Sequence, residues 1–378
     1  SLTAPFMTDE RTSEATSRST RRSFLKGLGS AAAAGSAISV AGLSAADADA
    51  RGTETETGGW AAPSLSRAPR TRIAADPTDV PPPVDWSAPR SHEITLSCKE
   101  VTAEIEPGVT FPCMTFDGQV PGPMIRVRQG DTVQFTLENV SAGAMPHNID
   151  FHAVYGTGGG AEATLAPPGQ SQTISFRAEY PGAFIYHCAV PNVDYHIASG
   201  MFGLIFVEPK DGLPAVDREF YLGQHEVYTN KPTGTDGEHA FDFDAMTRED
   251  PTYVLLNGQK QALTESGFGA MEIEVDETAR VFFANGGPNL TSSFHPIGNV
   301  WTKAWREGAV ASRPDRYVQT MTTGPGSCGV FEMDCPVPET IKLVDHALSR
   351  VVRKGFLGEI KVTGDPRPEI FDPAPTST

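Results

Sequence analysis

Short runs in which hydrophobic and polar residues alternate fill the chain from about residue 84 to residue 364. The alternation in "MIRVRQGDTVQFTLEN" (124–139) has the two-residue period of half-buried strands and predicts a pair of them. Residues 93–118 predict a hairpin that turns near Pro107 and Gly108. Gly, Pro and Asn separate the runs, and hardly any window has helical periodicity. We therefore expect an all-β protein.

The hydrophobic pattern occurs twice. "MEIEVDETARVFFAN" (271–285) repeats the pattern of residues 124–139, and "GFLGEIKV" (355–362) repeats "GMFGLIFV" (200–207) with both glycines in register. A repeat of roughly 150 residues is too long for a solenoid unit and indicates two homologous β-domains, most simply Greek-key sandwiches. The expected boundaries are a first domain over residues 84–210, a second over 215–364 and a C-terminal tail over 365–378.

The N-terminal region has a different composition. Arg21 and Arg22 precede a mildly apolar Ala/Gly-rich stretch that ends in small residues, which resembles a twin-arginine export signal over residues 1–50. The alternative is a disordered Ala-rich leader. Residues 51–83 are rich in Thr, Gly, Pro and charge without periodicity, and we expect a disordered linker. The signal predicts export to the periplasm or the outer face of the cell membrane.

Charge and hydropathy limit the possible partners. The 378 residues carry a formal net charge of -17, which argues against a nucleic acid partner because phosphate binding requires clustered Lys and Arg. Such an acidic surface stays soluble in high salt and is compatible with a halophilic source. No apolar run reaches the length of a bilayer span, so we expect no transmembrane segment in the mature domain.

One stretch concentrates residues that bind metals. "FIYHCAVPNVDYHIASGMFG" (184–203) contains Cys188, His196 and Met201, and "MPHNIDFH" contributes His147 upstream. Two imidazoles, a thiolate and a thioether are the ligands of an electron-transfer copper site. A lone buried Cys or Met usually packs a core. Four matching residue types, three of them around one loop, favour the copper site.

Three further histidines predict a second site. His187 precedes Cys188, so on a strand its ring points to the opposite face. His152 follows His147 by five residues, and His346 in "LVDHALSR" lies where the second half roughly echoes His187 and Cys188. Three imidazoles would leave an open position, as catalytic metals require. The alternative for each ring is a hydrogen-bonded structural role.

The segments "MPHNIDFH", "YHCA", "HIASGMFG", "SFHPIG" and "DHAL" together resemble copper-containing nitrite reductases over about residues 84–364. The resemblance implies two cupredoxin domains per chain, a homotrimer, a type 1 copper in the first domain and a catalytic type 2 copper between subunits. It also implies reduction of nitrite to nitric oxide with one electron and two protons, as in denitrification. The electron would come from a small donor protein such as a cupredoxin or a cytochrome.

The resemblance also implies the role of each residue. The type 1 ligands would be His147, Cys188, His196 and Met201. The type 2 ligands would be His152 and His187 of one subunit and His346 of its neighbour. Asp150 and His295 would deliver protons, and Ile297 would be a steric wall, with ordinary core packing an equal alternative. The sequence departs from the family in "PIGNVW" after His295 and in "TTGPGSCGVFEMDCPVPET" before His346.

The remaining cysteines, Cys98 with Cys113 and Cys328 with Cys335, could form two disulfides outside the cytoplasm. His92, His225 and His239 are expected at the surface or in structural roles. One alternative function is a two-domain multicopper oxidase, whose trinuclear cluster needs several His-X-His pairs, and the chain has none. The other alternative is an electron-transfer cupredoxin, which would leave Asp150 and the second histidine group unexplained.

Overall fold

The structure, a computed structural model, describes residues 72–374, and the expected signal over residues 1–50 lies outside this range. Strands dominate, and the longest helices are the short α1 (Val193–Ala198) and α2 (Phe243–Thr247). No helix in the described range is long and apolar enough to cross a membrane. The prediction of an all-β protein built from cupredoxin sandwiches is confirmed.

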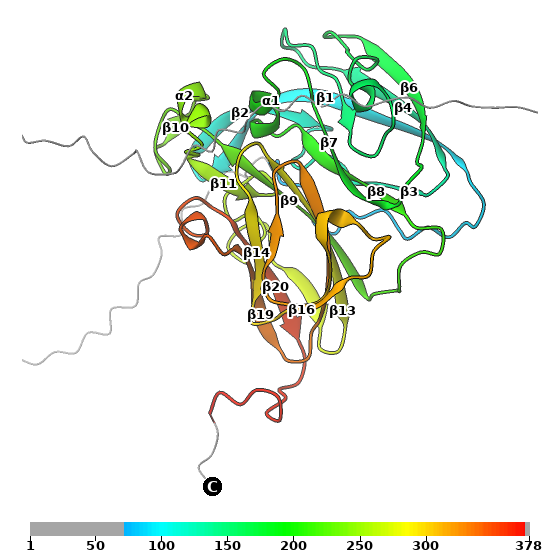
Figure 1. Cartoon of the computed structure of the whole chain (residues 1–378). Coiled ribbons are helices and arrows are strands. Elements are labelled where there is room, and N and C mark those ends of the chain that lie inside the picture. Colours follow the sequence, from blue (N-terminus) through cyan, green and yellow to red (C-terminus); the bar gives the residue numbers. More distant parts are fainter. Residues whose placement is uncertain (1–71, 375–378) are drawn as a thin grey trace, which may run out of the picture. The chain divides into compact units, whose positions relative to one another are not determined.

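The first sandwich contains two sheets, drawn mostly in cyan and green in Figure 1. The strands β1 (Ser91–Glu106) and β2 (Val109–Phe116) form a hairpin that turns at residues 107–108, as predicted. Residues on β4 (Thr132–Asn139) alternate between buried and accessible positions, so Val133, Phe135 and Leu137 enter the core. One sheet has the order β10 (Gly237–Glu238), β2 (Val109–Phe116), β1 (Ser91–Glu106), β4 (Thr132–Asn139), β6 (Ser171–Arg177). The other has the order β3 (Ile125–Arg128), β8 (Phe202–Glu208), β7 (Gly182–His187), β5 (Asp150–Phe151).

The second sandwich repeats this architecture with residues drawn mostly from yellow to red in Figure 1. Its first sheet has the order β11 (Tyr253–Leu256), β9 (Arg218–Val227), β13 (Thr278–Gly287), β18 (Ser327–Asp334), β15 (Trp301–Trp305), β16 (Asp315–Val318). Its second sheet has the order β12 (Met271–Glu274), β20 (Leu357–Thr363), β19 (Glu339–Asp345), β14 (Ser292–Ile297), β17 (Met321–Thr323).

A hydrophobic cluster and a charge network join the two sandwiches. Phe206 of β8 packs on Phe282 of β13, with ring centroids 4.9 Å apart. Nearby, Glu219 of β9 accepts hydrogen bonds from Arg126 of β3 and Arg280 of β13. Both arginines are buried, and buried charges of opposite sign must pair to offset their loss of hydration. The network therefore favours one fixed arrangement of β3, β9 and β13.

Residues 51–71 of the expected linker lie outside the described residues, but the last part of this linker contains packed residues. The linker was expected to extend to residue 83, with folding from about Val84. Instead, Ile73 and Ala74 are buried, and both backbone N–H groups donate to Oε1 of Gln259. A short apolar segment without alternation gave no signal of this packing, because its partners lie about 185 residues away in the chain.

The two proposed disulfides are wrong, since all five cysteines are free thiols. Cys113 lies opposite Val101 in the β1–β2 ladder, three residues along the strand from Cys98. Three residues of strand span about 10 Å, which exceeds the Cα separation that a disulfide bridges. Cys328 and Cys335 are seven residues apart on and just beyond β18, or about 23 Å.

Candidate metal centres

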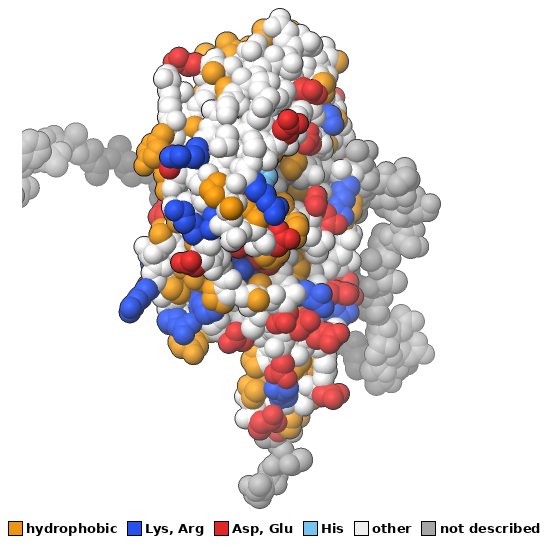
Figure 2. All heavy atoms as spheres, turned by 90° about the vertical axis from the view of Figure 1, so that its right-hand side faces the viewer, with side chains coloured by type: hydrophobic (Ala, Val, Ile, Leu, Met, Phe, Trp, Pro, Cys, Tyr) orange, Lys and Arg blue, Asp and Glu red, His pale blue; other side chains and the backbone are white. Residues whose placement is uncertain are grey.

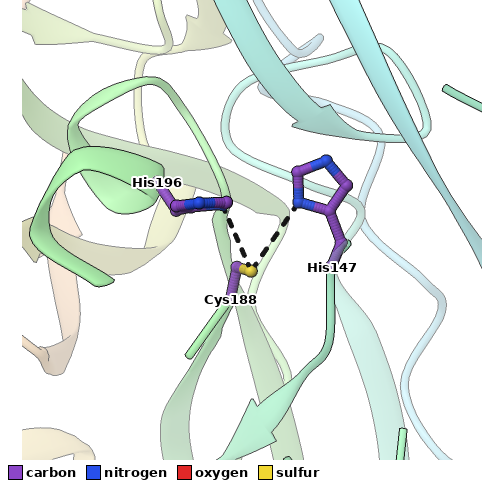
Figure 3. Close-up of side chains that lie close together, drawn as sticks. All are labelled: His147, Cys188 and His196. Carbon is purple, nitrogen blue, oxygen red and sulfur yellow. Dashed lines mark hydrogen bonds between the residues drawn. The ribbon is translucent and has the colours of Figure 1, made fainter. Parts of the chain in front are cut away.

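Three predicted copper ligands converge in the first sandwich. The Sγ atom of Cys188 lies 3.5 Å from Nδ1 of His196 and 3.8 Å from Nδ1 of His147. Figure 3 shows a nitrogen of each ring facing this sulfur. A metal–sulfur bond of about 2.3 Å and a metal–nitrogen bond of about 2.0 Å, at about 120°, separate the two ligand atoms by ~3.7 Å. The three side chains are therefore spaced as ligands of one ion.

The loop between β7 and β8 positions Cys188, His196 and Met201. Cys188 follows β7, His196 lies in α1, and Met201 immediately precedes β8. The N–H of Cys188 donates to the carbonyl of Met201, and the N–H of Met201 donates to the carbonyl of His196, both at 3.1 Å. Met201 is fully buried in the same hydrophobic cluster as Cys188. The two bonds hold the backbone of Met201, the predicted thioether ligand, next to the backbone of Cys188 and His196.

Burial decides the protonation of this group. It lowers the pKa of His147 to about 4, and burial together with the nearby His147 lowers the pKa of His196 to about 4. Burial raises the pKa of the Cys188 thiol, although the backbone N–H groups of Val190, Asn148 and Ala189 oppose this effect. Both imidazoles are thus neutral at neutral pH, as metal ligands must be. A metal ion that binds there displaces the thiol proton.

Two polar neighbours of this group were not identified from the sequence. Oδ1 of Asn148 accepts a hydrogen bond from the N–H of Ala189 at 2.7 Å and lies 3.6 Å from the Cys188 sulfur. Oε1 of Glu100, on β1, lies 3.4 Å from Nε2 of His147, the ring nitrogen that does not face the sulfur. A carboxylate at that nitrogen orients the ring and increases its basicity. Asn148 directly follows His147 and could have been suspected, whereas Glu100 is 47 residues away.

A second group lies on the other face of the same strand. Nε2 of His152 and Nε2 of His187 are 3.1 Å apart, and Oδ2 of Asp150 lies 3.9 Å from Nε2 of His187. Two nitrogens at this distance suit one ion, because metal–imidazole bonds are about 2.0–2.1 Å long. Two effects lower the pKa of His152: burial is the larger, and the nearby His187 is the smaller. This group too can hold a metal ion.

Strand pairing fixes these side chains. Asp150 of β5 lies opposite His187 of β7, and the N–H of His152 donates to the carbonyl of Ile185 at 3.1 Å. Nδ1–H of His187 donates to the carbonyl of Cys188 at 3.0 Å, which leaves Nε2 of His187 as the nitrogen available to a metal. A cavity of about 420 Å³ adjoins His152 and is lined by residues of both sandwiches, among them Ile185 and Ser327.

A glycine packs against Asp150. A Cβ atom at Gly159 would lie 1.9 Å from Oδ1 of Asp150 and 2.7 Å from the carbonyl oxygen of Phe151. Gly159 also has a φ of 57°, in the left-handed region that favours glycine. The run "TGGG" (157–160) was the available sequence signal, but its contact with Asp150 depends on the tertiary structure.

The remaining predicted residues lie on the second sandwich. The rings of His295 and His346 are 5.4 Å apart, and Nδ1–H of His295 donates to the carbonyl of Gln319 at 2.6 Å. Ile297 is 43% exposed, so core packing within this chain does not explain it. Neither histidine belongs to the group of Asp150, His152 and His187. The third imidazole predicted for that group is therefore not supplied within the described chain.

The other histidines have structural environments. Nε2 of His92 lies 2.8 Å from Oδ2 of the buried Asp131, and His225 and His239 are buried. Asp and Glu side chains are spread over the face shown in Figure 2, together with Lys and Arg side chains. Among the described residues, the possible metal ligands lie in the two groups that flank β7.

Comparisons with known proteins cover both sandwiches. A family model described as "Multicopper oxidase" matches residues 97–212. A copper-containing nitrite reductase of Neisseria meningitidis serogroup B is 45% identical over 293 residues, covering 78% of this chain and 74% of the relative. The copper-containing nitrite reductase of Cereibacter sphaeroides is 34% identical over 373 residues, covering 92% of this chain and 95% of the relative. The solved copper nitrite reductase from Nitrosomonas europaea has a TM-score of 0.65 at 33% identity, covering 74% of this chain and 96% of that chain.

Proposed function

The chain belongs to the family of copper-containing nitrite reductases, and we propose that the two groups flanking β7 are its type 1 and type 2 copper sites. The protein is a copper-dependent oxidoreductase that reduces nitrite to nitric oxide. The adjacency of His187 and Cys188 carries the proposal, because these two residues link the two groups through a single peptide unit.

His147, Cys188, His196 and Met201 would hold the type 1 copper. Their donor set of two imidazoles, a thiolate and a thioether suits an electron-transfer copper rather than a hard cation such as Mg²⁺. The group is buried, so the surrounding protein excludes water and limits structural change when the charge of the site changes. Cys188 and His187 then provide a short path to the second group, through the peptide unit and the hydrogen bond from the His187 ring to the Cys188 carbonyl.

His152 and His187 would hold the type 2 copper together with His346 of a neighbouring subunit. Two imidazoles of one chain converge, whereas His346 lies on the second sandwich outside the group. A head-to-tail arrangement, in which the first sandwich of one subunit meets the second sandwich of the next, forms a ring when the rotation between subunits closes. We propose that this ring is a homotrimer with one type 2 site at each interface.

Bound copper supplies a one-electron relay at the first site and, at the second, a Lewis-acid centre for nitrite. The chain supplies the protons. The Asp150 carboxyl lies beside the His187 ring and, with His295 of the neighbouring subunit, would pass protons to the oxygen that leaves as water. The exposed Ile297 would border the substrate as a steric wall from the same neighbouring surface.

We propose export by the twin-arginine route to the periplasm or the outer face of the cell membrane, and a small cupredoxin or cytochrome as electron donor. The proposed domains are residues 84–210 and 215–364, and the packed residues Ile73 and Ala74 precede the first of them. The acidic composition stays compatible with a halophilic source.

The match of the multicopper oxidase family model to residues 97–212 favours the oxidase alternative. That match covers roughly one sandwich. A trinuclear cluster is disfavoured because the sequence has no His-X-His pair. The electron-transfer alternative has no use for His152 and Asp150, which lie next to His187 on the face opposite the first group.

Electron paramagnetic resonance of the copper-loaded protein tests the assignment. We expect two Cu(II) signals and two coppers per chain, with nitrite perturbing only the type 2 signal. In Cys188→Ala, the intense visible thiolate absorption should disappear while the type 2 signal remains. A single signal in the wild type, or a strong visible band in Cys188→Ala, would contradict the proposal.

A further inference from the structure

The second sandwich contains a counterpart of the type 1 site. Nδ2 of Asn139 donates to the carbonyls of Met145 and Ala166, and Nδ2 of Asn285 donates to those of Leu290 and Thr323. His147 bridges to Ala166 and Ser292 pairs with Thr323. The two asparagines therefore align the sandwiches and place Ser292 at the position of His147.

Strand register extends the alignment to the other ligands. Asp150 pairs with His187, and His295, three residues after Ser292, pairs with Val344. Cys188 follows His187, so its counterpart is Asp345, which follows Val344. His187 pairs with Phe202 and Val344 pairs with Leu357, so Phe356 takes the position of Met201. His346 is thus the counterpart of Ala189, one residue beyond the position expected from the sequence.

Backbone N–H groups surround the Asp345 carboxylate in the same way as they surround the Cys188 sulfur. The N–H groups of Ser293 and Ala347 donate to Oδ1 of Asp345, at 3.2 and 3.0 Å. Their counterparts are Asn148 and Val190, whose N–H groups face the sulfur of Cys188. The second sandwich has therefore kept the anion-binding backbone of the copper site and has exchanged the thiolate for a carboxylate.

The guanidinium of Arg350 provides the positive charge that faces Asp345. Nη1 of Arg350 lies 2.6 Å from Oδ2 of Asp345 and donates to the carbonyl of Thr291 at 2.8 Å. The Asp345 side chain is fully buried, and that of Arg350 is 21% exposed. We propose that the Asp345–Arg350 ion pair replaces a metal ion at this position and positions His346 for the type 2 site. This inference rests on the proposed role of His346.

The contacts around His346 explain how the pair acts. The N–H of His346 donates to the carbonyl of Ser293 at 2.7 Å, and Asp345 binds the N–H groups of Ser293 and Ala347 on either side of that bond. Arg350 joins this loop to Thr291, just before β14, which also carries His295. Asp345 and Arg350 are therefore positioning residues, because their contacts fix the backbone from which the His346 ring projects.

Type 2 copper affinity in Arg350→Gln tests the inference, measured by titrating copper-depleted full-length protein and following the type 2 resonance signal. We expect an affinity loss of about 10–100-fold, as for other residues that orient metal ligands. The visible type 1 band, which depends on the first sandwich, should keep its intensity. Arg353→Gln is the matched control, since Arg353 is exposed and makes no ion pair with the described residues.

The double variant Asp345→Asn with Arg350→Gln removes both charges and keeps an oxygen for Ser293 and Ala347. It should assemble and bind type 2 copper more tightly than Arg350→Gln but less tightly than the wild type. Wild-type affinity in either variant, while His346→Ala loses the type 2 signal, would overturn the positioning role and leave the type 2 assignment intact. Retention of type 2 copper in His346→Ala would instead overturn the proposed site.

Discussion

His187 and Cys188 are consecutive residues at the end of β7, yet their side chains belong to two different groups of metal-binding residues. The strand directs them to opposite faces, and Nδ1–H of His187 donates to the carbonyl of Cys188 at 3.0 Å. One peptide unit thereby joins the buried group around Cys188 to the group around His187.

Asp150→Asn should keep both coppers and reduce nitrite turnover by about 10²–10⁴-fold, the usual contribution of a general acid or base. Asparagine has the size of aspartate but cannot release and regain a proton. Steady-state turnover with an excess of reductant measures the effect, and the two resonance signals report copper loading. Near-normal turnover would remove Asp150 from the mechanism.

Gly159→Ala should lower turnover without weakening the type 1 band, because a Cβ at this position would lie 1.9 Å from Oδ1 of Asp150 and displace the carboxylate. Gly158→Ala is the matched control. Gly158 has a similar φ of 55°, but its Cβ would meet only Ala161, at 3.5 Å. Both variants carry the same backbone strain, so equal losses of activity would argue against a specific effect on Asp150.

The intersubunit site predicts complementation. His152→Ala and His346→Ala should each be inactive, because each lacks one type 2 ligand. Mixed trimers, formed by dissociating and reassembling both variants together, should regain part of the activity at interfaces that combine an intact first sandwich with an intact second one. Each variant reassembled alone is the control. Inactive mixed trimers that still bind type 1 copper would exclude a site shared between subunits.

Glu100→Gln should raise the reduction potential of the type 1 site. The carboxylate lies 3.4 Å from Nε2 of His147, where its negative charge strengthens electron donation by the ring and favours the more positive oxidised metal. Spectroelectrochemical titration of the visible band measures the potential. Glu93→Gln is the control, since Glu93 is exposed on the same strand. Equal potentials in the two variants would mean that Glu100 does not influence the site.

His225→Phe should reduce the acid sensitivity of folding. Burial lowers the pKa of His225 from 6.5 to about 4, so between these values the unfolded chain takes up a proton that the folded chain does not. The free energy of unfolding therefore falls as the pH decreases from about 6.5 to about 4. Without this group, the slope should be shallower by up to about 1.4 kcal/mol per pH unit. Denaturant titrations of copper-loaded protein across this range measure the slope, and an unchanged slope would contradict the prediction.

Residue types and their order were enough to predict the strands, the two metal-binding groups and the family of this protein. Alternating runs predicted the strands because a half-buried strand exposes every second side chain. The order of His147, Cys188, His196 and Met201 predicted one metal group, because three of these residues border a single loop. Since His187 and Cys188 are adjacent on a strand, the sequence also placed two groups on opposite faces. The predicted family and activity are confirmed by the relatives.

Contacts between distant segments could only be decided by the tertiary structure. The cysteines expected to form disulfides lie too far apart along their strands, and Ile73 and Ala74 are buried and hydrogen-bonded to Gln259. Glu100 lies beside His147, and Arg350 neutralises the charge of Asp345. The local hydrophobic pattern predicts neither contact. Register and packing depend on the whole set of strands at once. The sequence therefore determined which side chains could bind copper, and the fold decided which of them meet and what holds them in position.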